Sequence, residues 1–410
     1  MRLAVVGAGS TYTPELVSGL DRLDVERLAF HDVDAGRLDV VGGMARRMLE
    51  RQGFAGELVL TGELDAALEG ADFVVIQIRV GGQEARLRDE TVPLACGCIG
   101  QETTGAGGLA KALRTVPAVL EIAERVREQA TPEAWILDFT NPVGIVTRAL
   151  LDAGHRAVGL CNVAIGFQRS FARMLGVEPE RLLVDQVGLN HLTWVRAVLL
   201  DGDDVLPQLI AEHGDDLGAQ AHVSRRLVEE LGAVPSYYLR YFYAHDDVLG
   251  EQLDSEPRAA TVAAIERELL ELYRDPSLTE KPALLERRGG AFYSDAALSL
   301  LVSLAEGDDA VHVVDIRNAG TLTGLADDDV VEVPARVDRS GASPLPQAQL
   351  APELLGLVQH VAAYERLAAE AALADDRTLV RKALLAHPLI GQERITEDLL
   401  ESLFAQKVAT

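Results

Sequence analysis

The first third of the chain alternates short apolar runs with longer stretches in which apolar residues recur every three or four positions. Runs of the first kind predict buried strands, and stretches of the second kind predict helices with one apolar face. Strands are expected at residues 2–7, 27–33, 57–62, 71–79, 134–140 and 156–161. Helices are expected between them at residues 13–22, 36–52, 64–69 and 107–128. This alternation predicts an α/β fold, a Rossmann-type doubly wound parallel sheet covered by helices on both faces.

The pattern changes near residue 165, where longer helical stretches follow with a few strands among them. The helices are expected at residues 165–176, 206–231, 258–274, 292–306 and 352–374. The strands are expected at residues 183–188, 193–200, 311–316 and 330–338. No repeat and no Pro/Gly-rich hinge separates the halves. We therefore expect two closely packed domains, a Rossmann-like domain at residues 1–165 and a mixed, mainly helical α+β domain at residues 166–410.

Length and composition are those of a globular protein. A chain of 410 residues with 48% hydrophobic and 25% charged residues is long enough for two domains with a sizeable core. No apolar run approaches the roughly 20 residues that span a bilayer. The first apolar stretch, LAVVGAG, runs directly into a glycine-rich turn, as a buried strand would and a signal peptide would not. These features predict a cytoplasmic protein with no membrane partner.

Charge and cysteine content exclude further classes. A formal net charge of −26 argues against nucleic acid as a partner, because phosphates require a basic face. Three cysteines cannot build a disulfide framework. A small anionic ligand is compatible with this charge only where a few arginines raise the local potential.

The Gly7-Ala8-Gly9 segment follows the first predicted strand and precedes a helix. Residues without side chains in such a turn let the backbone approach a pyrophosphate at a helix N-terminus. The usual third glycine is replaced by Tyr12, so the match to the dinucleotide fingerprint is partial. Asp32 ends the second strand, where a carboxylate would bind ribose hydroxyls. Together these features predict dinucleotide binding.

The carboxylate of Asp32 favours NAD over NADP. The neighbouring His31 and Arg37 leave NADP open at this stage.

Several polar segments are harder to explain as scaffold. Asn141 ends one predicted strand, Cys161 ends another, and His191 lies among apolar residues. Taken alone, each has an ordinary structural explanation: a turn asparagine, a small buried cysteine, a core histidine. A thiolate and an imidazole could instead share a divalent metal with substrate oxygens. The polar segments are residues 78–90, 97–108, 138–144, 159–167, 187–195 and 234–243.

Taken together, these segments resemble glycoside hydrolase family 4, and within it the 6-phospho-β-glucosidase branch. The resemblance extends from Met1 to about residue 400. It rests on the motifs VVGAGSTYTPEL, IRVGG, IGQETTGAGG, FTNPVGIVT, CNVA, GLNHLTW, YYLRYFY, LERRGGAFYSDAA and VVEVPARVD.

The resemblance implies two cofactors, NAD and a divalent metal, usually manganese. It implies that Cys161 and His191 are metal ligands and that Tyr238 is the catalytic base. The positions implied to bind NAD are Gly7, Gly9, Ser10, Thr11 and Asp32. The positions implied to bind substrate are Arg86, Asn141, Asn162 and Arg258, with Arg240, Arg287 and Arg288 as further cationic candidates.

The residue after the metal cysteine distinguishes the branches of the family. Asparagine at this position resembles the 6-phospho-β-glucosidases, and the residue here is Asn162. The usual proline two residues later is Ala164, a departure that bears on the branch and not on the family. The resemblance thus implies a phosphorylated disaccharide as substrate and a homodimer or homotetramer as assembly.

Ordinary glycosidases use two carboxylates, and NAD-dependent glycosidases are an exception. The route implied here begins with oxidation at C3 of the sugar, which acidifies the C2 proton so that Tyr238 can remove it. Elimination of the leaving group, addition of water and return of the hydride complete the cycle. No protein acid for the leaving group is identified, since Asn162 cannot serve as a carboxylic acid would.

Two alternatives remain at this stage. One is an NAD-dependent 2-hydroxy-acid dehydrogenase of the same architecture, which has no evident use for a Cys–His metal pair or a tyrosine base. The other is a non-catalytic sugar-phosphate sensor that uses NAD only as a structural ligand.

Overall fold

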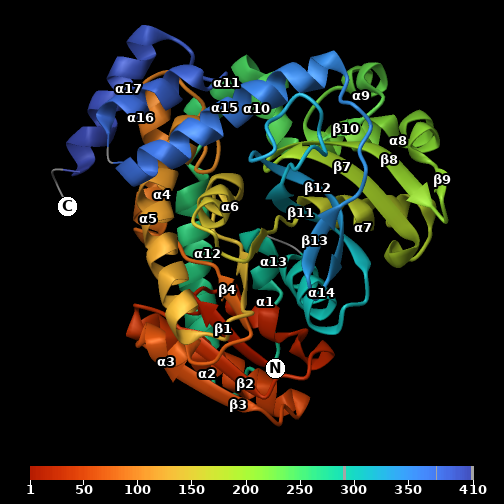
Figure 1. Cartoon of the computed structure of the whole chain (residues 1–410). Coiled ribbons are helices and arrows are strands. Elements are labelled where there is room, and N and C mark those ends of the chain that lie inside the picture. The colour runs from red at the N-terminus through yellow and green to blue at the C-terminus, as the bar shows by residue number, and fades with distance from the viewer. Residues whose placement is uncertain (290–291, 375, 408–410) are drawn as a thin grey trace.

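The structure is a computed structural model that describes residues 1–289, 292–374 and 376–407 (Figure 1). Its N-terminal half is built from six strands and the helices that connect them. The strands are β1 (Arg2–Val6), β2 (Arg27–His31), β3 (Glu57–Thr61), β4 (Phe73–Ile76), β5 (Trp135–Asp138) and β6 (Ala157–Gly159). The helices are α1 (Thr13–Val17), α2 (Ala35–Gln52), α3 (Leu64–Leu68), α4 (Gly82–Ala95), α5 (Gly105–Gln129) and α6 (Val143–Asp152).

The second half contains longer helices and an antiparallel extension of the sheet. Its strands are β7 (Leu182–Leu189), β8 (Leu192–Leu200), β9 (Asp203–Asp204), β10 (Val234–Pro235), β11 (Ala310–Arg317), β12 (Val330–Asp338) and β13 (Gly341–Pro344). Its first helices are α7 (Val163–Leu175), α8 (Leu206–Ala221), α9 (Arg225–Leu231), α10 (Arg240–Tyr243), α11 (His245–Leu253) and α12 (Arg258–Tyr273). Its last helices are α13 (Leu284–Arg288), α14 (Tyr293–Glu306), α15 (Pro352–Ala374), α16 (Arg377–Ala386) and α17 (Glu393–Lys407).

One sheet runs through both halves of the described chain. The order β3-β2-β1-β4-β5-β6 is parallel throughout, with Val6 opposite both His31 and Ile76. β11 then joins β6 antiparallel through the pairing of Asp315 with Gly159, and β12, β7, β8 and β10 continue the sheet. The parallel order confirms the Rossmann-type fold. The order in which successive strands are added reverses between β1 and β4, the position at which such sheets bind ligands.

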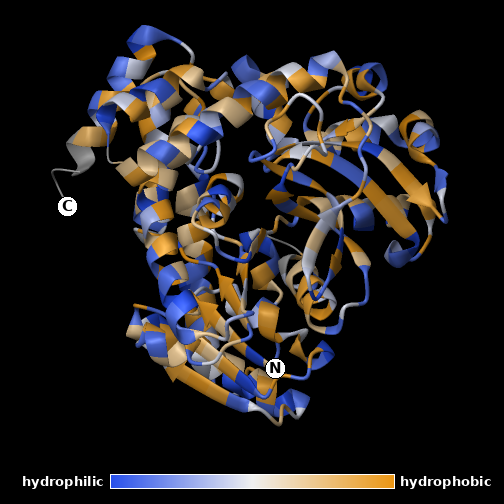
Figure 2. Ribbon diagram, viewed as in Figure 1, coloured by the Kyte–Doolittle hydropathy of each residue, from blue (hydrophilic) through white to orange (hydrophobic). Residues whose placement is uncertain are grey.

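The apolar positions account for this arrangement. Strands β1 and β4 are buried on both faces and therefore read as continuous apolar runs rather than alternating ones. One buried cluster extends from these strands into β12, α14 and α15. A second cluster, which includes Phe171, Val195 and Leu209, packs α7 and α8 against β7 and β8. Figure 2 shows the strands as mainly hydrophobic ribbons beneath helices of mixed character.

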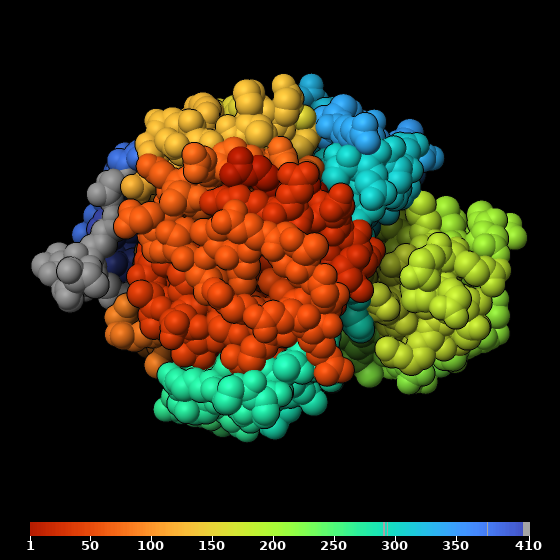
Figure 3. All heavy atoms as spheres, turned by 90° about the horizontal axis from the view of Figure 1, so that it is seen from below, coloured from red at the N-terminus to blue at the C-terminus, as the bar shows by residue number. Residues whose placement is uncertain are grey.

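The segment around α7, α8 and β7–β9 bulges from the side of the molecule (Figure 3). The helix expected at residues 206–231 is in fact two helices, α8 and α9. His222 takes a left-handed φ of 55° after α8, and Ser224 caps α9 by accepting from the Leu227 amide at 3.2 Å. A serine cap of this kind favours a new helix start over continuation. No helix in the described part of the chain combines the length and apolarity needed to cross a bilayer.

Candidate active site

The turn after β1 leaves room only for backbone. Gly7 has a φ of +90°, and a Cβ on it would lie 2.8 Å from the carbonyl oxygen of Gln77. A Cβ on Gly9 would lie 2.8 Å from the carboxyl group of Asp32. The Gly9 amide donates to Asp32 Oδ2 at 2.8 Å. Because neither position tolerates a side chain, the backbone of the turn can line the cleft directly at the switch point of the sheet.

A cleft of about 1630 Å³ opens at this turn. It is larger than typical small-ligand pockets, which reach about 1,000 Å³. Val33 is 93% exposed beside Asp32 and offers an apolar surface to a flat ring. Thr11 instead lies buried beneath the turn, where its carbonyl accepts from the Tyr273 hydroxyl at 2.7 Å. The other side chains along the cleft include Ser10, Arg37, Arg79, Lys111 and Asn141.

The cleft residues fit NAD. Asp32 accepts one hydrogen bond from Gly9 and one from the Asp34 amide at 2.9 Å. A carboxylate has about four acceptor positions, so about two remain for the hydroxyls of a ribose. Gly7, Gly9 and Ser10 line the cleft where the pyrophosphate would lie, and Asp32 would hold the ribose.

The structure brings Cys161 and His191 to neighbouring positions. Cys161 follows β6, and His191 lies in the two-residue turn that connects β7 to β8. Asn190 links them, because its side chain hydrogen-bonds the Cys161 thiol and also donates to Glu332 Oε2 at 2.9 Å. His191 has a φ of 62°, a left-handed conformation that is costly for a residue with a side chain. Strain of this kind at a polar residue is common in functional sites.

Tyr238 covers this pair. It lies in the short 3-10 turn η3 (Tyr237–Leu239), and its ring stacks on His191 with centroids 3.6 Å apart. Tyr237 stacks on its other side at 4.2 Å. Burial, reinforced by Tyr237 and Cys161, raises the pKa of Tyr238 well above that of an ordinary phenol. A cation is therefore needed nearby if Tyr238 is to act as a base at neutral pH.

The donor set fits a divalent metal. Burial raises the pKa of the Cys161 thiol, reinforced by Glu332, and burial together with Lys111 lowers the pKa of His191 to about 3. The histidine is thus a neutral imidazole, ready to coordinate, and a bound cation would remove the thiol proton. Among the described residues, no group of three His, Cys, Asp or Glu side chains is arranged to hold a metal. A metal at Cys161 and His191 would keep open positions for substrate oxygens or water, as a catalytic metal does.

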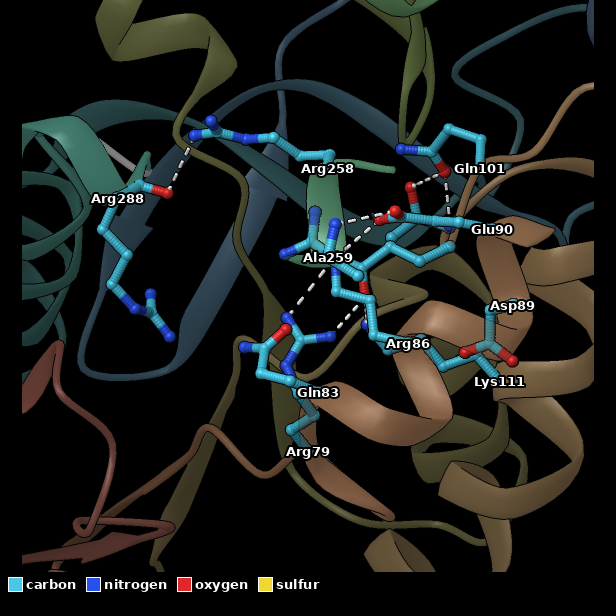
Figure 4. A network of polar contacts seen from close by, with 12 residues as sticks. Arg79, Gln83, Arg86, Asp89, Glu90, Gln101, Lys111, Arg258, Ala259 and Arg288 are labelled. Carbon is cyan, nitrogen blue, oxygen red and sulfur yellow. Dashed lines mark hydrogen bonds and ion pairs between the residues drawn. The ribbon is translucent and has the colours of Figure 1, made fainter. Parts of the chain in front are cut away.

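The carboxylate of Glu90 joins Arg86 to the backbone next to Arg258. Arg86 Nε donates to Glu90 Oε1 at 2.8 Å, and Glu90 Oε2 accepts from the Ala259 amide at 2.8 Å, next to Arg258 (Figure 4). Arg258 is exposed at the first turn of α12 and donates to the carbonyls of residues 287 and 288 at 3.2 and 3.3 Å. Glu90 thus holds the start of α12 against α4, while the Arg258 side chain extends away from Arg86 toward the Arg288 carbonyl (Figure 4).

Sequence reasoning missed a buried cationic cluster beside Arg86. Glu102 accepts from Lys111 Nζ at 2.7 Å and from Arg79, and its Oε1 forms an ion pair with Arg86 Nε at 3.2 Å. Burial alone would raise the pKa of Glu102, but these cations hold it well below its usual range. Burial and Arg79 lower the pKa of Lys111 to about 8. The available signal was a lysine within an otherwise apolar helical stretch of a chain that has few lysines.

The two asparagines occupy different surroundings. Asn141 lines the cleft, and its buried Oδ1 meets no hydrogen-bond donor among the described residues, which marks a place for a ligand. Asn162 directly precedes α7, beside Cys161.

The three further arginine candidates for substrate binding lie in different surroundings. Arg287 lines the cleft, Arg288 pairs with Glu266 at 2.7 Å, and Arg240 lies over the Tyr241 ring at 5.3 Å. The LERRGGAFYSDAA motif includes Gly290 and Ala291, which lie outside the described residues.

The large cleft and the Cys–His pair are adjacent but distinct. The residues that line the cleft do not include Cys161, His191 or Tyr238. Residues 141–142 connect the regions, because Asn141 lines the cleft and Pro142 lines a smaller cavity next to His191. Thr103 and Thr104, in the loop at residues 97–108, line the smaller cavity.

Comparison with known proteins gives matches along nearly the whole chain. The model of the family 4 glycosyl hydrolases matches residues 2–177, and the model of their C-terminal domain matches residues 186–390. A probable 6-phospho-β-glucosidase of Bacillus subtilis is 39% identical, with 98% of this chain and 95% of that protein covered. A 6-phospho-β-glucosidase of Escherichia coli is 35% identical, with 97% and 93% covered.

Solved structures agree with these matches. The 6-phospho-β-glucosidase of Thermotoga maritima, solved with manganese, NAD+ and glucose-6-phosphate, has a TM-score of 0.93 and 33% identity, with 100% of this chain and 98% of that one covered. A malate dehydrogenase of Plasmodium falciparum has a TM-score of 0.56 and 14% identity, with 91% and 98% covered, and shares the fold alone.

Proposed function

The chain belongs to family 4 of the glycosyl hydrolases, and on that premise we propose that it hydrolyses 6-phospho-β-glucosides with the help of NAD and a divalent metal, for which manganese is the first candidate. One observation carries the choice of substrate. Three 6-phospho-β-glucosidases share 35–39% identity with the chain, whereas the phospho-α-glucosidases and maltose-6'-phosphate glucosidases share 25–27%. Asn162 after Cys161 supports the same branch.

Arg86 and Arg258 are proposed to bind the sugar phosphate. Charge-assisted contacts between guanidinium and phosphate are strong because several donors point in a fixed plane. Arg86 is held in place by Glu90 and Glu102, while Arg258 is exposed and available to an incoming anion. Asn141, with its unpaired carbonyl oxygen, is proposed to accept from a sugar hydroxyl.

Tyr238 is proposed to move the proton at C2 of the sugar. Its hydroxyl lies in the Cys161–His191 cluster, where the sugar ring would bind. When bound, NAD supplies a reversible hydride acceptor for C3, and the metal supplies Lewis acidity toward the sugar hydroxyls. Oxidation at C3 acidifies the C2 proton, Tyr238 Oη accepts it, and the leaving group departs from C1 by elimination. No carboxylic acid occupies position 162, so the chain offers no proton donor there for the leaving oxygen.

NAD rather than NADP is the expected cofactor. Arg37 is already engaged, since its Nε donates to the Gly9 carbonyl at 3.0 Å and its Nη2 lies 3.6 Å from Glu266. A 2'-phosphate would be repelled by the Asp32 carboxylate, and these contacts of Arg37 oppose its turning toward that phosphate.

We propose that residues 1–165 bind NAD and that residues 166–410 bind substrate and metal and form the contacts of a homodimer or homotetramer. A phosphorylated disaccharide and a dinucleotide are charged metabolites that do not cross a bilayer unaided. We therefore propose a cytoplasmic location.

A turnover assay tests the function. With NAD and Mn2+ present, the protein should cleave a chromogenic 6-phospho-β-glucoside and should leave the α-anomer and the unphosphorylated β-glucoside nearly untouched. NADH should not accumulate, because the hydride returns in every cycle. Net NADH production from a 2-hydroxy acid would favour a dehydrogenase, and sugar-phosphate binding without turnover would favour a sensor.

A further inference from the structure

The loop at residues 97–108 makes one direct contact with the proposed metal site. Thr103 Oγ1 lies 2.9 Å from His191 Nδ1 and 2.8 Å from Gln101 Oε1. The backbone amides of Thr103 and Thr104 also donate to Gln101 Oε1, the latter at 3.0 Å. A chain of polar contacts thus runs from Gln101 through Thr103 to the imidazole.

The backbone amides determine which group donates in each of these hydrogen bonds. Two peptide N–H groups point at one atom of the Gln101 amide, so that atom must be the oxygen, which can only accept. The Thr103 hydroxyl, at 2.8 Å from the same oxygen, must therefore donate to it. Its own oxygen then faces His191 Nδ1 as an acceptor. The only donor left for the 2.9 Å contact is a proton on Nδ1.

The opposite assignment leaves an unfavourable contact. If the Thr103 hydroxyl donated to His191 Nδ1, the oxygens of Thr103 and Gln101 would face each other at 2.8 Å with no proton between them. In a partly buried site such a contact is costly, because two lone pairs face each other at close range.

The loop is itself anchored from the far end of the chain. The Tyr364 hydroxyl on α15 donates to the Gly105 carbonyl at 3.2 Å, and the Gly105 amide donates to His387 Nε2 at 3.2 Å. Gly105 has a φ of +66° and connects the loop to α5. These contacts hold Thr103 at a fixed distance from the β7–β8 turn.

We propose that Thr103, oriented by Gln101, is a positioning residue that holds His191 as the Nδ1–H tautomer and so leaves Nε2 as the nitrogen that binds a divalent cation. The part that concerns the cation rests on the metal role of His191 proposed above. A second partner that fixes the tautomer of a ligating histidine typically changes metal affinity 10- to 100-fold.

The tautomer is measured first, in metal-free protein labelled with 15N-histidine. A two-bond 1H–15N correlation distinguishes protonated from unprotonated ring nitrogens, and the His191→Asn variant identifies the His191 signals. The expected result is a protonated Nδ1 and an unprotonated Nε2. A protonated Nε2 would overturn the proposal. Because neither metal nor substrate is present, the absence of glycosidase activity has no bearing on this result.

Metal affinity is measured second, by electron paramagnetic resonance of free Mn2+ without substrate. Thr103→Val keeps the shape and removes the hydroxyl, and should weaken Mn2+ binding by about 10- to 100-fold. Thr103→Ser restores the hydroxyl and should bind Mn2+ as wild type does. Thr104→Val is the control, because Thr104 is the next residue of the same loop and borders the same small cavity, but its hydroxyl is not part of the His191 contact. Unchanged affinity in a Thr103→Val protein that still binds NAD would refute the role.

A second variant keeps the proposal testable if Thr103→Val fails to fold. Gln101→Leu removes the acceptor and leaves Thr103 in place, so the hydroxyl becomes free to donate to His191. The fraction of His191 protonated at Nε2 should then rise. An unchanged tautomer in this variant would show that Gln101 does not orient the hydroxyl.

Discussion

The Lys111 ammonium donates to the Glu102 carboxylate at 2.7 Å, and both side chains are more than nine-tenths buried. Removing one partner of a buried ion pair leaves an uncompensated charge, which typically costs about 3–5 kcal/mol. Glu102→Gln should therefore lower the free energy of unfolding by several kcal/mol in urea titrations. Glu84→Gln breaks the exposed Glu84–Arg88 pair and should change it by less than about 1 kcal/mol. Equal effects of the two variants would contradict the structural role of Glu102.

Arg258→Ala should raise the KM for 6-phospho-β-glucosides by about 10- to 100-fold, the range expected for loss of a hydrogen bond to a charged group. Activity toward an unphosphorylated glucoside, if measurable, should change little. Arg226→Ala is the control, because Arg226 is an exposed helix arginine paired with Glu230 at 2.7 Å. An unchanged KM in Arg258→Ala would remove this residue from the phosphate site.

Tyr238→Phe should abolish hydrolysis while NAD binding survives, because the ring and its stacking on His191 remain and only the hydroxyl is lost. Turnover of wild-type protein in D2O should place deuterium at C2 of the released sugar phosphate, since elimination removes and later replaces that hydrogen. The Tyr237→Phe variant tests whether the Tyr237 hydroxyl also accepts the C2 proton, and this variant should retain measurable turnover. Near-normal activity of Tyr238→Phe together with no deuterium at C2 would disprove the elimination route.

Chelation should abolish activity, and Mn2+ should restore it. Affinity for Mn2+ should rise with pH, because burial raises the pKa of the Cys161 thiol and the bound form requires a thiolate. Calorimetry in two buffers of different ionisation enthalpy would count the protons released. Cys161→Ser should bind Mn2+ more weakly, and full activity of this variant in the presence of EDTA would exclude the metal from the mechanism.

The buried carboxyl group of Asp138 makes the free energy of unfolding depend on pH. Burial raises the pKa of this carboxyl to about 8, against the lowering effect of hydrogen bonds from Thr140 and Thr147. The pKa in the unfolded chain is about 4. Between these values the unfolded chain loses the proton and the folded protein keeps it, so this group lowers the free energy of unfolding as pH rises.

The variant Asp138→Asn should flatten that decline between about pH 4 and 8, as measured by urea unfolding at a series of pH values. The asparagine side chain can accept from the Thr140 amide and donate to the Thr147 hydroxyl, so the contacts are preserved. An unchanged slope would show that Asp138 does not contribute.

Much of the fold could be predicted from the sequence, because buried parallel strands and long amphipathic helices have strong apolar patterns. All six strands of the parallel sheet lie where the apolar runs placed them. The helices α4 and α6 were missed because their polar and glycine-containing starts resemble loops. The break at His222 was missed because a single left-handed residue leaves no trace in apolar periodicity.

The candidate site was only partly accessible from the sequence. Cys161 and His191 each have an ordinary structural explanation, and only the family resemblance pointed to a shared metal. The role of Thr103 depends on its contact with His191, far along the chain, and that of Glu102 on cations from neighbouring segments that only the fold brings together. No local pattern encodes either. Asp32, in contrast, follows a strand at a characteristic distance from a glycine turn, so it could be identified directly.

The anchoring of Gly105 by Tyr364 and His387 has a consequence for biosynthesis. Domains fold as units during translation, and the N-terminal unit is generally the first to do so. A nascent chain can therefore form its cofactor cleft while α15 and α16 are still unsynthesised, whereas the Gly105 end of its metal-site loop gains these two contacts only after both helices have been made. Firm binding of the metal should then follow synthesis of α16, and a polypeptide terminated before Tyr364 should retain NAD but bind manganese more weakly.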